Sequence, residues 1–330
     1  MRRRHPRWGA KKLLAVAARR EPRTPWPSRS TVCTWLKQRG LVTPHRRRPP
    51  SAHTPAVALT PATRANELWT TDFKGEFRTG DGVYCDPLTV RDGFSRFVLR
   101  CDGLLGRTGE ATQRRFARAF AEYGLPDRIR SDKGGPFASP GLGGLSALSV
   151  WWIRLGILPE RIAPGHPEQN GSHEQCHRGL KAETARPPAP NRAAQQQRCR
   201  RFVREYNEER PHEALADQLP AMSYAPSHRP LPARLPPVDY PGHLDVRLVR
   251  SNGCVSWTSA PLFVATPLAG HYVAFEEIDD GFWTLHFGTV ALARYDERHR
   301  SIHPIASQCA AGRSASFAGS APNSKNGNQQ

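Results

Sequence analysis

The 330-residue sequence predicts a mixed α/β fold, preceded by a helical part and followed by an all-β part. Apolar residues recur at helical spacing near the start, strand-like and helical runs alternate in the middle, and short strand-like runs separated by turns come last. Proline-rich segments divide the three parts. We predict a basic helix-turn-helix module at 1–48, a linker at 49–64, an α/β core at 65–219, a second linker at 220–241, a small β-barrel at 242–305 and a disordered tail at 306–330.

Positive charge is concentrated at the start of the chain. The 48 Lys and Arg residues against 29 Asp and Glu give a net charge of +19. Residues 1–50 hold fifteen of the basic residues and a single acid, Glu21, so this segment contributes 15 − 1 = +14 of that charge. Such an excess indicates a polyanionic partner, most often nucleic acid.

The basic segment has the pattern of two short helices. Leu13, Leu14 and Ala17 predict a helix over about 8–20, and Ser28 or Ser30 can cap a second one, for which Val32, Trp35 and Leu36 supply an apolar face. We expect the second helix to enter a DNA major groove, although a plain helical hairpin has the same pattern. The candidate DNA contacts are Arg29, Lys37, Arg39, Arg46, Arg47 and Arg48.

Strands and helices alternate through the core. The predicted core strands lie at 68–73, 84–90, 94–101 and 128–131, with a short one at Ile162. The predicted core helices lie at 109–123, 145–156, 171–181 and 192–208. The all-β part should contain strands at 246–250, 254–257, 272–278, 282–287 and 290–295.

Three acidic residues lie at positions where they could form a metal-binding site. Asp72 and Asp132 each lie at the end of a strand, and Glu174 lies one turn into a helix. Carboxylates are the ligands that Mg²⁺ or Mn²⁺ prefers, and two such ions promote phosphoryl displacement. Glu168, in the loop before the helix, is a rival to Glu174, whose helical register we favour.

Basic residues follow Glu174 on the same helix face. Arg178 is four and Lys181 seven residues later, so all three side chains project to one side. Cations beside a metal-binding carboxylate could bind the phosphate backbone of DNA next to the bond that is cleaved. A helix-stabilising pair between Glu174 and Arg178 is the simpler alternative, and it leaves Lys181 unexplained.

Several classes of protein are excluded. No run approaches the roughly 20 apolar residues that a membrane-spanning helix needs, so we expect no membrane contact and a cytoplasmic protein. The seven cysteines are scattered without a Cys-x-x-Cys pair, which indicates reduced thiols and no zinc module.

Four blocks in order identify a resemblance. Residues 68–73, 130–137, 166–174 and 206–215 resemble the integrase core of bacterial insertion-sequence transposases, which are relatives of retroviral integrases. The resemblance implies an RNase H-like core with a mixed sheet and a DDE active site. The site is carried over as Asp72, Asp132 and Glu174, with Lys181 at the family's basic position. Asn170, in the third block, is a further candidate DNA contact.

The resemblance also implies an activity and its partners. It implies a metal-dependent polynucleotidyl transferase that binds terminal inverted repeats and uses two Mg²⁺ or Mn²⁺ ions to cleave strands and transfer them into target DNA. A homo-oligomer would assemble on paired ends, in the bacterial nucleoid. The helix-turn-helix would recognise the repeats, and the terminal β segment is similar to the SH3-like barrel that often follows such cores.

Some features depart from the family pattern. Lys133 places a cation beside Asp132, and a glycine-rich insertion at 140–145 lengthens the spacing from Asp132 to Glu174. The first helix begins within a few residues of Met1, so we expect an N-terminally truncated module. Two alternatives therefore stay open: a catalytically degenerate DNA-binding protein that represses or inhibits transposition, and a nuclease that cuts without joining.

Overall fold

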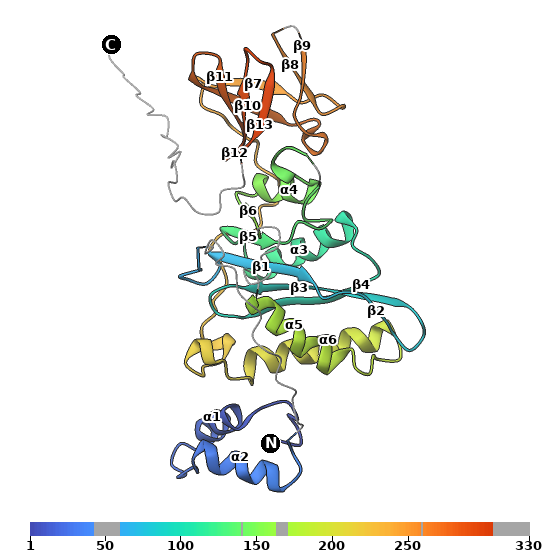
Figure 1. Cartoon of the computed structure of the whole chain (residues 1–330), viewed down its shortest axis with the longest axis vertical. Coiled ribbons are helices and arrows are strands. Elements are labelled where there is room, and N and C mark those ends of the chain that lie inside the picture. The colour runs from blue at the N-terminus through green and yellow to red at the C-terminus, as the bar shows by residue number, and fades with distance from the viewer. Residues whose placement is uncertain (43–59, 140, 163–170, 259, 306–330) are drawn as a thin grey trace, which may run out of the picture.

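The computed structural model describes residues 1–42, 60–139, 141–162, 171–258 and 260–305. A helical pair lies at one end of the molecule, an α/β core occupies the middle, and a β domain lies at the other end (Figure 1). The mixed α/β core expected from the sequence is confirmed. No helix in the described ranges is long and apolar enough to span a bilayer.

The helical pair consists of α1 (Ala10–Arg20) and α2 (Arg29–Gln38), close to the predicted ranges. The side chain of Ser28 caps α2 by accepting a hydrogen bond from the Thr31 amide at 3.2 Å. Trp8 is buried against α1, and Leu36 packs on the same cluster. Trp35, expected on the apolar face of this helix, is 46% exposed, and α2 buries none of its residues fully.

The core sheet is mixed. Its strands are β1 (Leu68–Phe73), β2 (Phe77–Arg78), β3 (Tyr84–Asp92), β4 (Val98–Leu104), β5 (Arg128–Ser131) and β6 (Leu158–Arg161). They run in the order β2-β3-β1-β5-β6, with β4 paired to β3. β1, β3 and β4 form an antiparallel meander, whereas β5 pairs in parallel with both β1 and β6. β4 begins later than predicted because Arg96 adopts a positive φ in the preceding turn.

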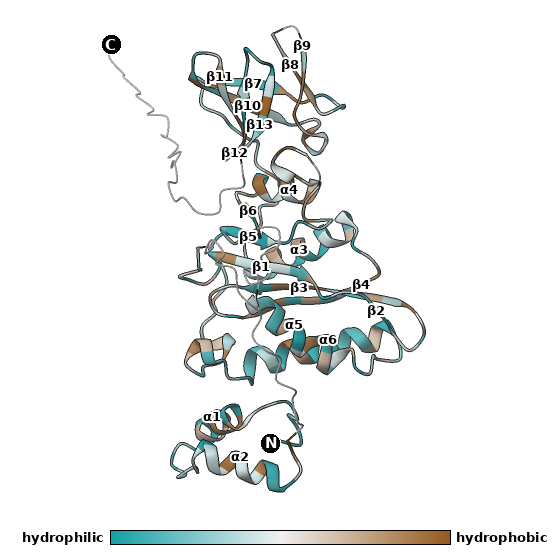
Figure 2. Cartoon of the chain, viewed as in Figure 1, coloured by the Kyte–Doolittle hydropathy of each residue, from teal (hydrophilic) through white to brown (hydrophobic). Residues whose placement is uncertain are grey.

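Helices cover both faces of this sheet. They are α3 (Gly109–Tyr123), α4 (Ala147–Arg154), α5 (Gly171–Thr184) and α6 (Arg192–Glu208). Phe116 and Phe120 of α3 and Trp152 of α4 are buried against one face, while α5 and α6 pack on the other through Leu180 and Phe202. Hydrophobic and hydrophilic stretches alternate along α6, as expected for a helix with one buried side (Figure 2).

The β domain contains a five-stranded antiparallel sheet and a hairpin. Its strands are β7 (Asp245–Leu248), β8 (Cys254–Trp257), β9 (Ala260–Phe263), β10 (Tyr272–Asp279), β11 (Phe282–Phe287), β12 (Val290–Asp296) and β13 (Ser301–Pro304). Five of these were predicted; β9 and β13 were missed because each contains a proline, which argues against a strand. Leu145 and Ile153 of the core share one apolar cluster with Phe275 and Leu285 of this domain.

Candidate active site

Two of the predicted acids lie at one edge of the core sheet. β1 and β5 pair in parallel, with Leu68 opposite Arg128 and Thr70 opposite Arg130. Continued for two further residues, this register brings Asp72 level with Asp132. Both side chains are partly exposed at the carboxyl ends of the strands.

The two carboxylates are electrostatically coupled. Burial, and after it the negative charge of Asp132, raise the pKa of Asp72 to about 7. A carboxylate whose ionisation is disfavoured by a neighbouring carboxylate marks a place where a divalent cation is stabilising.

A glycine leaves room for the Asp132 carboxylate. The Gly134 amide donates to Asp132 Oδ1 at 3.2 Å, and a Cβ added at Gly134 would lie 3.1 Å from Asp132 Oδ2. Any side chain at position 134 would therefore crowd this carboxylate. Lys133, a departure from the family pattern, is exposed.

Glu174 lies exposed in the first turn of α5, and buried histidines attach that helix to the sheet. Thr89 Oγ1 on β3 is 2.6 Å from His173 Nε2 and 2.6 Å from His177 Nε2. His173 Nδ1 is also 2.9 Å from Thr70 Oγ1 on β1. The helix that carries Glu174 is thus bonded directly to the strand that carries Asp72.

A buried arginine fixes the start of the same helix. Arg91 is 1% exposed and donates to the Ser172 carbonyl at 2.7 Å and to Ser172 Oγ at 2.6 Å. Together with the histidines, these bonds anchor α5 on both sides of Glu174.

Two further residues near Asp72 were not among the predicted site residues. His177 Nδ1 lies 3.5 Å from Asp72 Oδ2, and burial lowers the pKa of His177 to about 3, so its imidazole is neutral. Lys74 lies two residues after Asp72, where burial and the nearby Lys181 lower its pKa. The four-residue spacing of His173 and His177, which puts both on one helix face, was the available signal.

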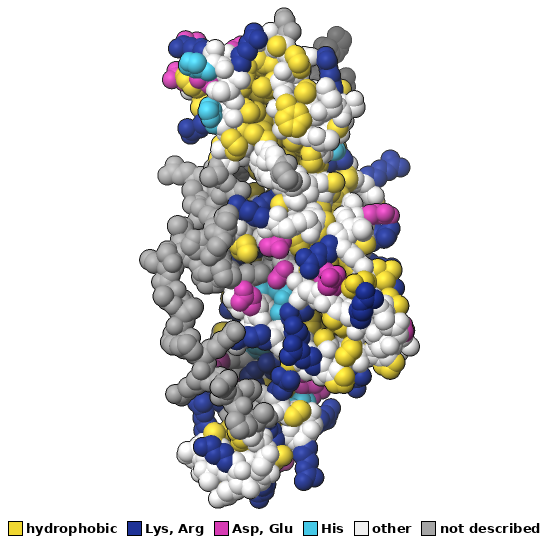
Figure 3. Space-filling model, turned by 45° about the vertical axis from the view of Figure 1, so that its right-hand side comes forward, with side chains coloured by type: hydrophobic (Ala, Val, Ile, Leu, Met, Phe, Trp, Pro, Cys, Tyr) yellow, Lys and Arg dark blue, Asp and Glu magenta, His cyan; other side chains and the backbone are white. Residues whose placement is uncertain are grey.

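The predicted basic residues are exposed wherever the structure describes them. Arg178 and Lys181 project from α5, and Arg29, Lys37 and Arg39 belong to α2 or directly follow it. Within the described ranges Glu174 forms no ion pair with Arg178, so the helix-stabilising alternative finds no support. Figure 3 shows acidic side chains beside histidine in the middle of this face, with lysine and arginine side chains clustered just below. Glu168, Asn170, Arg46, Arg47 and Arg48 lie outside the described residues.

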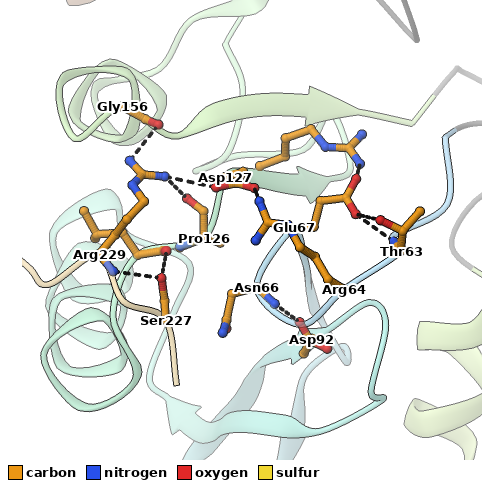
Figure 4. Close-up of polar contacts among 12 residues, drawn as sticks. Thr63, Arg64, Asn66, Glu67, Asp92, Pro126, Asp127, Gly156, Ser227 and Arg229 are labelled. Carbon is orange, nitrogen blue, oxygen red and sulfur yellow. Dashed lines mark hydrogen bonds and ion pairs between the residues drawn. The ribbon is translucent and has the colours of Figure 1, made fainter. Parts of the chain in front are cut away.

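The opposite ends of β1 and β5 are held by a polar network (Figure 4). Arg229, from the segment predicted as the second linker, donates to the Pro126 carbonyl at 2.9 Å and forms an ion pair with Asp127 at 3.4 Å. Asp127 also pairs with Arg64, just before β1, at 2.5 Å. These contacts secure the strands whose other ends carry the acids.

The donor chemistry fits a divalent metal, although the full triad is not assembled. Asp72 and Asp132 offer hard oxygen ligands, and a bound cation would favour the ionised form of Asp72 that burial and Asp132 disfavour. In the part of the chain that the structure describes, no three His, Cys, Asp or Glu residues are grouped closely enough to hold a metal ion. Glu174 therefore stands apart from the two aspartates.

Comparisons with known proteins agree on the core. Two family models, each described as an integrase core domain, match residues 62–167 and 155–220. An uncharacterised 31.7 kDa protein of insertion element IS407 from Burkholderia multivorans is 26% identical over 225 residues, which cover 68% of this chain and 77% of that protein.

Solved integrase structures are more distant. A chain of the simian T-cell lymphotropic virus intasome, in complex with a PP2A regulatory subunit, is 15% identical, with a TM-score of 0.44 over 86% of this chain and 93% of that one. The magnesium-bound catalytic core of HTLV-2 integrase, in its dimeric form, is 14% identical, with a TM-score of 0.35 over 49% of this chain and 96% of that one.

Proposed function

We propose that the chain is an integrase-superfamily transposase of an insertion sequence, which binds terminal inverted repeats and catalyses Mg²⁺-dependent cleavage and transfer of DNA strands; the matches to the integrase core domain and to the IS407 protein support this proposal. The observation that carries this proposal is the coupled pair Asp72 and Asp132 at one sheet edge. The anchored helix α5 supports it, because α5 presents Glu174 beside the same strand.

In the proposed site, Asp72, Asp132 and Glu174 provide the metal ligands. Two bound Mg²⁺ or Mn²⁺ ions would activate a water or a 3′-hydroxyl and stabilise the leaving oxygen. Glu174 would complete the site by a movement of its exposed side chain towards the aspartates, while the bonds of Arg91 and the histidines hold the backbone of α5. The imidazole of His177 would orient the Asp72 carboxylate. Because this imidazole is neutral, it would add no positive charge to compete with the metal for that carboxylate.

Two groups of basic residues would bind the DNA, one near the active site and one in the helical pair. Arg178, Lys181 and Asn170 would hold phosphates near the scissile bond. The helical pair would act as the helix-turn-helix that reads terminal repeats, through Arg29, Lys37, Arg39 and the Arg46–Arg48 run. The β domain would serve as the SH3-like barrel, and the chain would act as a homo-oligomer on paired ends at the bacterial nucleoid.

A strand-joining assay tests this function. Purified full-length protein is incubated with Mg²⁺ and labelled DNA from the regions that flank its reading frame. We compare Glu174→Gln with Glu110→Gln, because each removes one exposed carboxylate from the first turn of a core helix. Joined products that are lost only in Glu174→Gln support a transposase. Cleavage without joining indicates a nuclease, and DNA that is bound but intact indicates the catalytically degenerate protein.

A further inference from the structure

We propose that an arginine-lined groove between the end of α5 and the helix α6 binds the phosphate backbone of DNA outside the catalytic site. This inference rests on the proposed function, because it takes DNA to be the substrate. The groove encloses about 370 Å³. Arg186, Arg198 and Arg201 line it, and none of the three belongs to the predicted DNA contacts.

The acids in the groove are engaged elsewhere. Glu183 pairs with Arg210 at 3.8 Å, and Glu205 Oε1 lies 2.7 Å from His5 Nδ1, from which it accepts a hydrogen bond. Burial also raises the pKa of Glu183, which disfavours its negative charge. The three lining arginines outnumber the two lining carboxylates, so the groove keeps an excess of positive charge.

The arginines are available to an incoming anion. Arg186 and Arg201 are exposed, and among the described residues neither forms a hydrogen bond or an ion pair. Arg198 donates to the Pro187 carbonyl at 2.7 Å, which holds the connecting loop against α6. Guanidinium groups bind phosphate oxygens in a bidentate manner, so the groove suits a phosphodiester better than a neutral ligand.

Cations lead along α5 to this groove. Lys181 is exposed in the last turn of α5, which ends at Thr184, and Arg186 follows two residues later in the groove lining. Lys181 and Arg186 thus lead from the helix that carries Glu174 to the groove. A DNA strand whose scissile phosphate lies at Asp72 and Asp132 could continue along these cations, and its next phosphates would enter the groove.

The helix α6 itself offers a matched control. Arg200 and Arg204 are exposed on the same helix, do not line the groove, and form no ion pair within the described residues. The variant Arg186→Gln/Arg201→Gln and the control Arg200→Gln/Arg204→Gln each remove two positive charges. A general effect of net charge would therefore change both proteins equally.

The test measures binding of a labelled DNA duplex by the full-length proteins at salt concentrations from about 50 to 300 mM. Loss of two phosphate contacts should reduce the slope of log affinity against log salt by about two in the groove variant and leave the control near wild type. Equal slopes in the two variants, whether reduced or unchanged, would overturn the groove proposal. The variant Arg201→Gln alone should reduce the slope by about one, and thermal melting verifies that each variant is folded.

Different results would reject the groove proposal and the proposed function. Glu174→Gln should keep the wild-type salt slope and lose strand joining. The groove variant should lose affinity but still join strands at saturating DNA. If the groove variant has the reduced salt slope but the wild-type protein joins no strands, the DNA-binding groove is supported and the transposase activity is rejected.

Discussion

At the scale of single residues, ionisation of the Asp72 carboxyl group makes the stability of the folded protein depend on pH. Its pKa of about 7 in the folded protein, raised by burial and by Asp132, exceeds the ordinary value of 3.8. The folded protein therefore holds a proton that the unfolded chain has released between these two pH values. Stability falls as pH rises through this window, and the loss is complete above about pH 7.

Replacement of Asp72 by Asn should remove that loss. In the absence of divalent metal, Asp72→Asn should melt at a higher temperature than wild type at pH 8, and the difference should shrink towards pH 4. A gain of about 1 kcal/mol would raise the Tm by about 2–4 °C. The exposed Asp279→Asn serves as control and should show no such pH-dependent difference. An Asp72→Asn advantage that is equal at pH 8 and pH 4 would refute the assignment of the effect to ionisation.

Gly134 is a second single-residue test. A methyl group at this position would lie 3.1 Å from Asp132 Oδ2 and displace the carboxylate. The carboxylate would have to give by a few tenths of an ångström, and because misplacement by 1 Å can slow a reaction by about a hundredfold, Gly134→Ala should lower strand joining several-fold at unchanged DNA affinity. Gly106→Ala, where the methyl group meets no atom within 4 Å, should retain wild-type joining. Unimpaired joining by Gly134→Ala would show that the Asp132 carboxylate tolerates the crowding.

At the scale of elements, the attachment of α5 to the sheet decides where Glu174 lies. The hydroxyl of Thr89 contacts both His173 and His177, so Thr89→Val leaves two buried ring nitrogens without this partner. Each unsatisfied polar group costs about 1–3 kcal/mol. We expect faster amide hydrogen exchange in α5 and reduced strand joining, while binding of DNA persists.

Thr112→Val is the matched control for this change. It removes a buried hydroxyl that donates to the Thr108 carbonyl at 2.8 Å within α3, away from α5. It should leave exchange in α5 unchanged. Equal exchange in α5 for both variants would show that the Thr89 bonds do not hold that helix.

The elements differ in how far the sequence predicts them. The helix at 192–208 was predicted with its observed bounds, because Asn191 caps it and its apolar residues follow one face. The strand β9 was missed, since Pro261 argues against a strand and only pairing with β8 overrides that preference. Local pattern also placed Asp72 and Asp132 at strand ends, but it could not supply the parallel pairing that brings them level. The contact between His177 and Asp72 is purely tertiary.

At the scale of the whole molecule, the basic helical pair divides its charges between the core and solvent. His5 stacks on Trp8 and contacts Glu205 on α6, while Lys11 on α1 pairs with Glu213 at 2.9 Å and Asp217 at 3.5 Å. α1 thus faces the core, and α2 keeps its basic residues exposed. The high charge of the first fifty residues therefore serves both attachment to the core and, as we propose, binding of DNA.

This division predicts unequal effects of two single-charge changes. Lys37→Gln on α2 should lower affinity for element-end DNA and reduce the salt slope by about one. Lys11→Gln, which removes the same charge from α1, should leave the slope unchanged because Lys11 is already paired. Fluorescence anisotropy over a salt series measures both. A larger effect of Lys11→Gln would mean that α1, rather than α2, faces the DNA.

The arrangement of carboxylates can be tested most directly by locating bound metal. Crystals of the full-length protein are soaked in Mn²⁺ at pH 8, where Asp72 is ionised, and the manganese is located by its anomalous scattering. We expect manganese in direct contact with Asp72 and Asp132, with Glu174 drawn into the site, and no such peak in Asp132→Asn. Manganese bound elsewhere, or absent from this sheet edge at saturating concentration, would contradict a metal-dependent active site formed by these three residues.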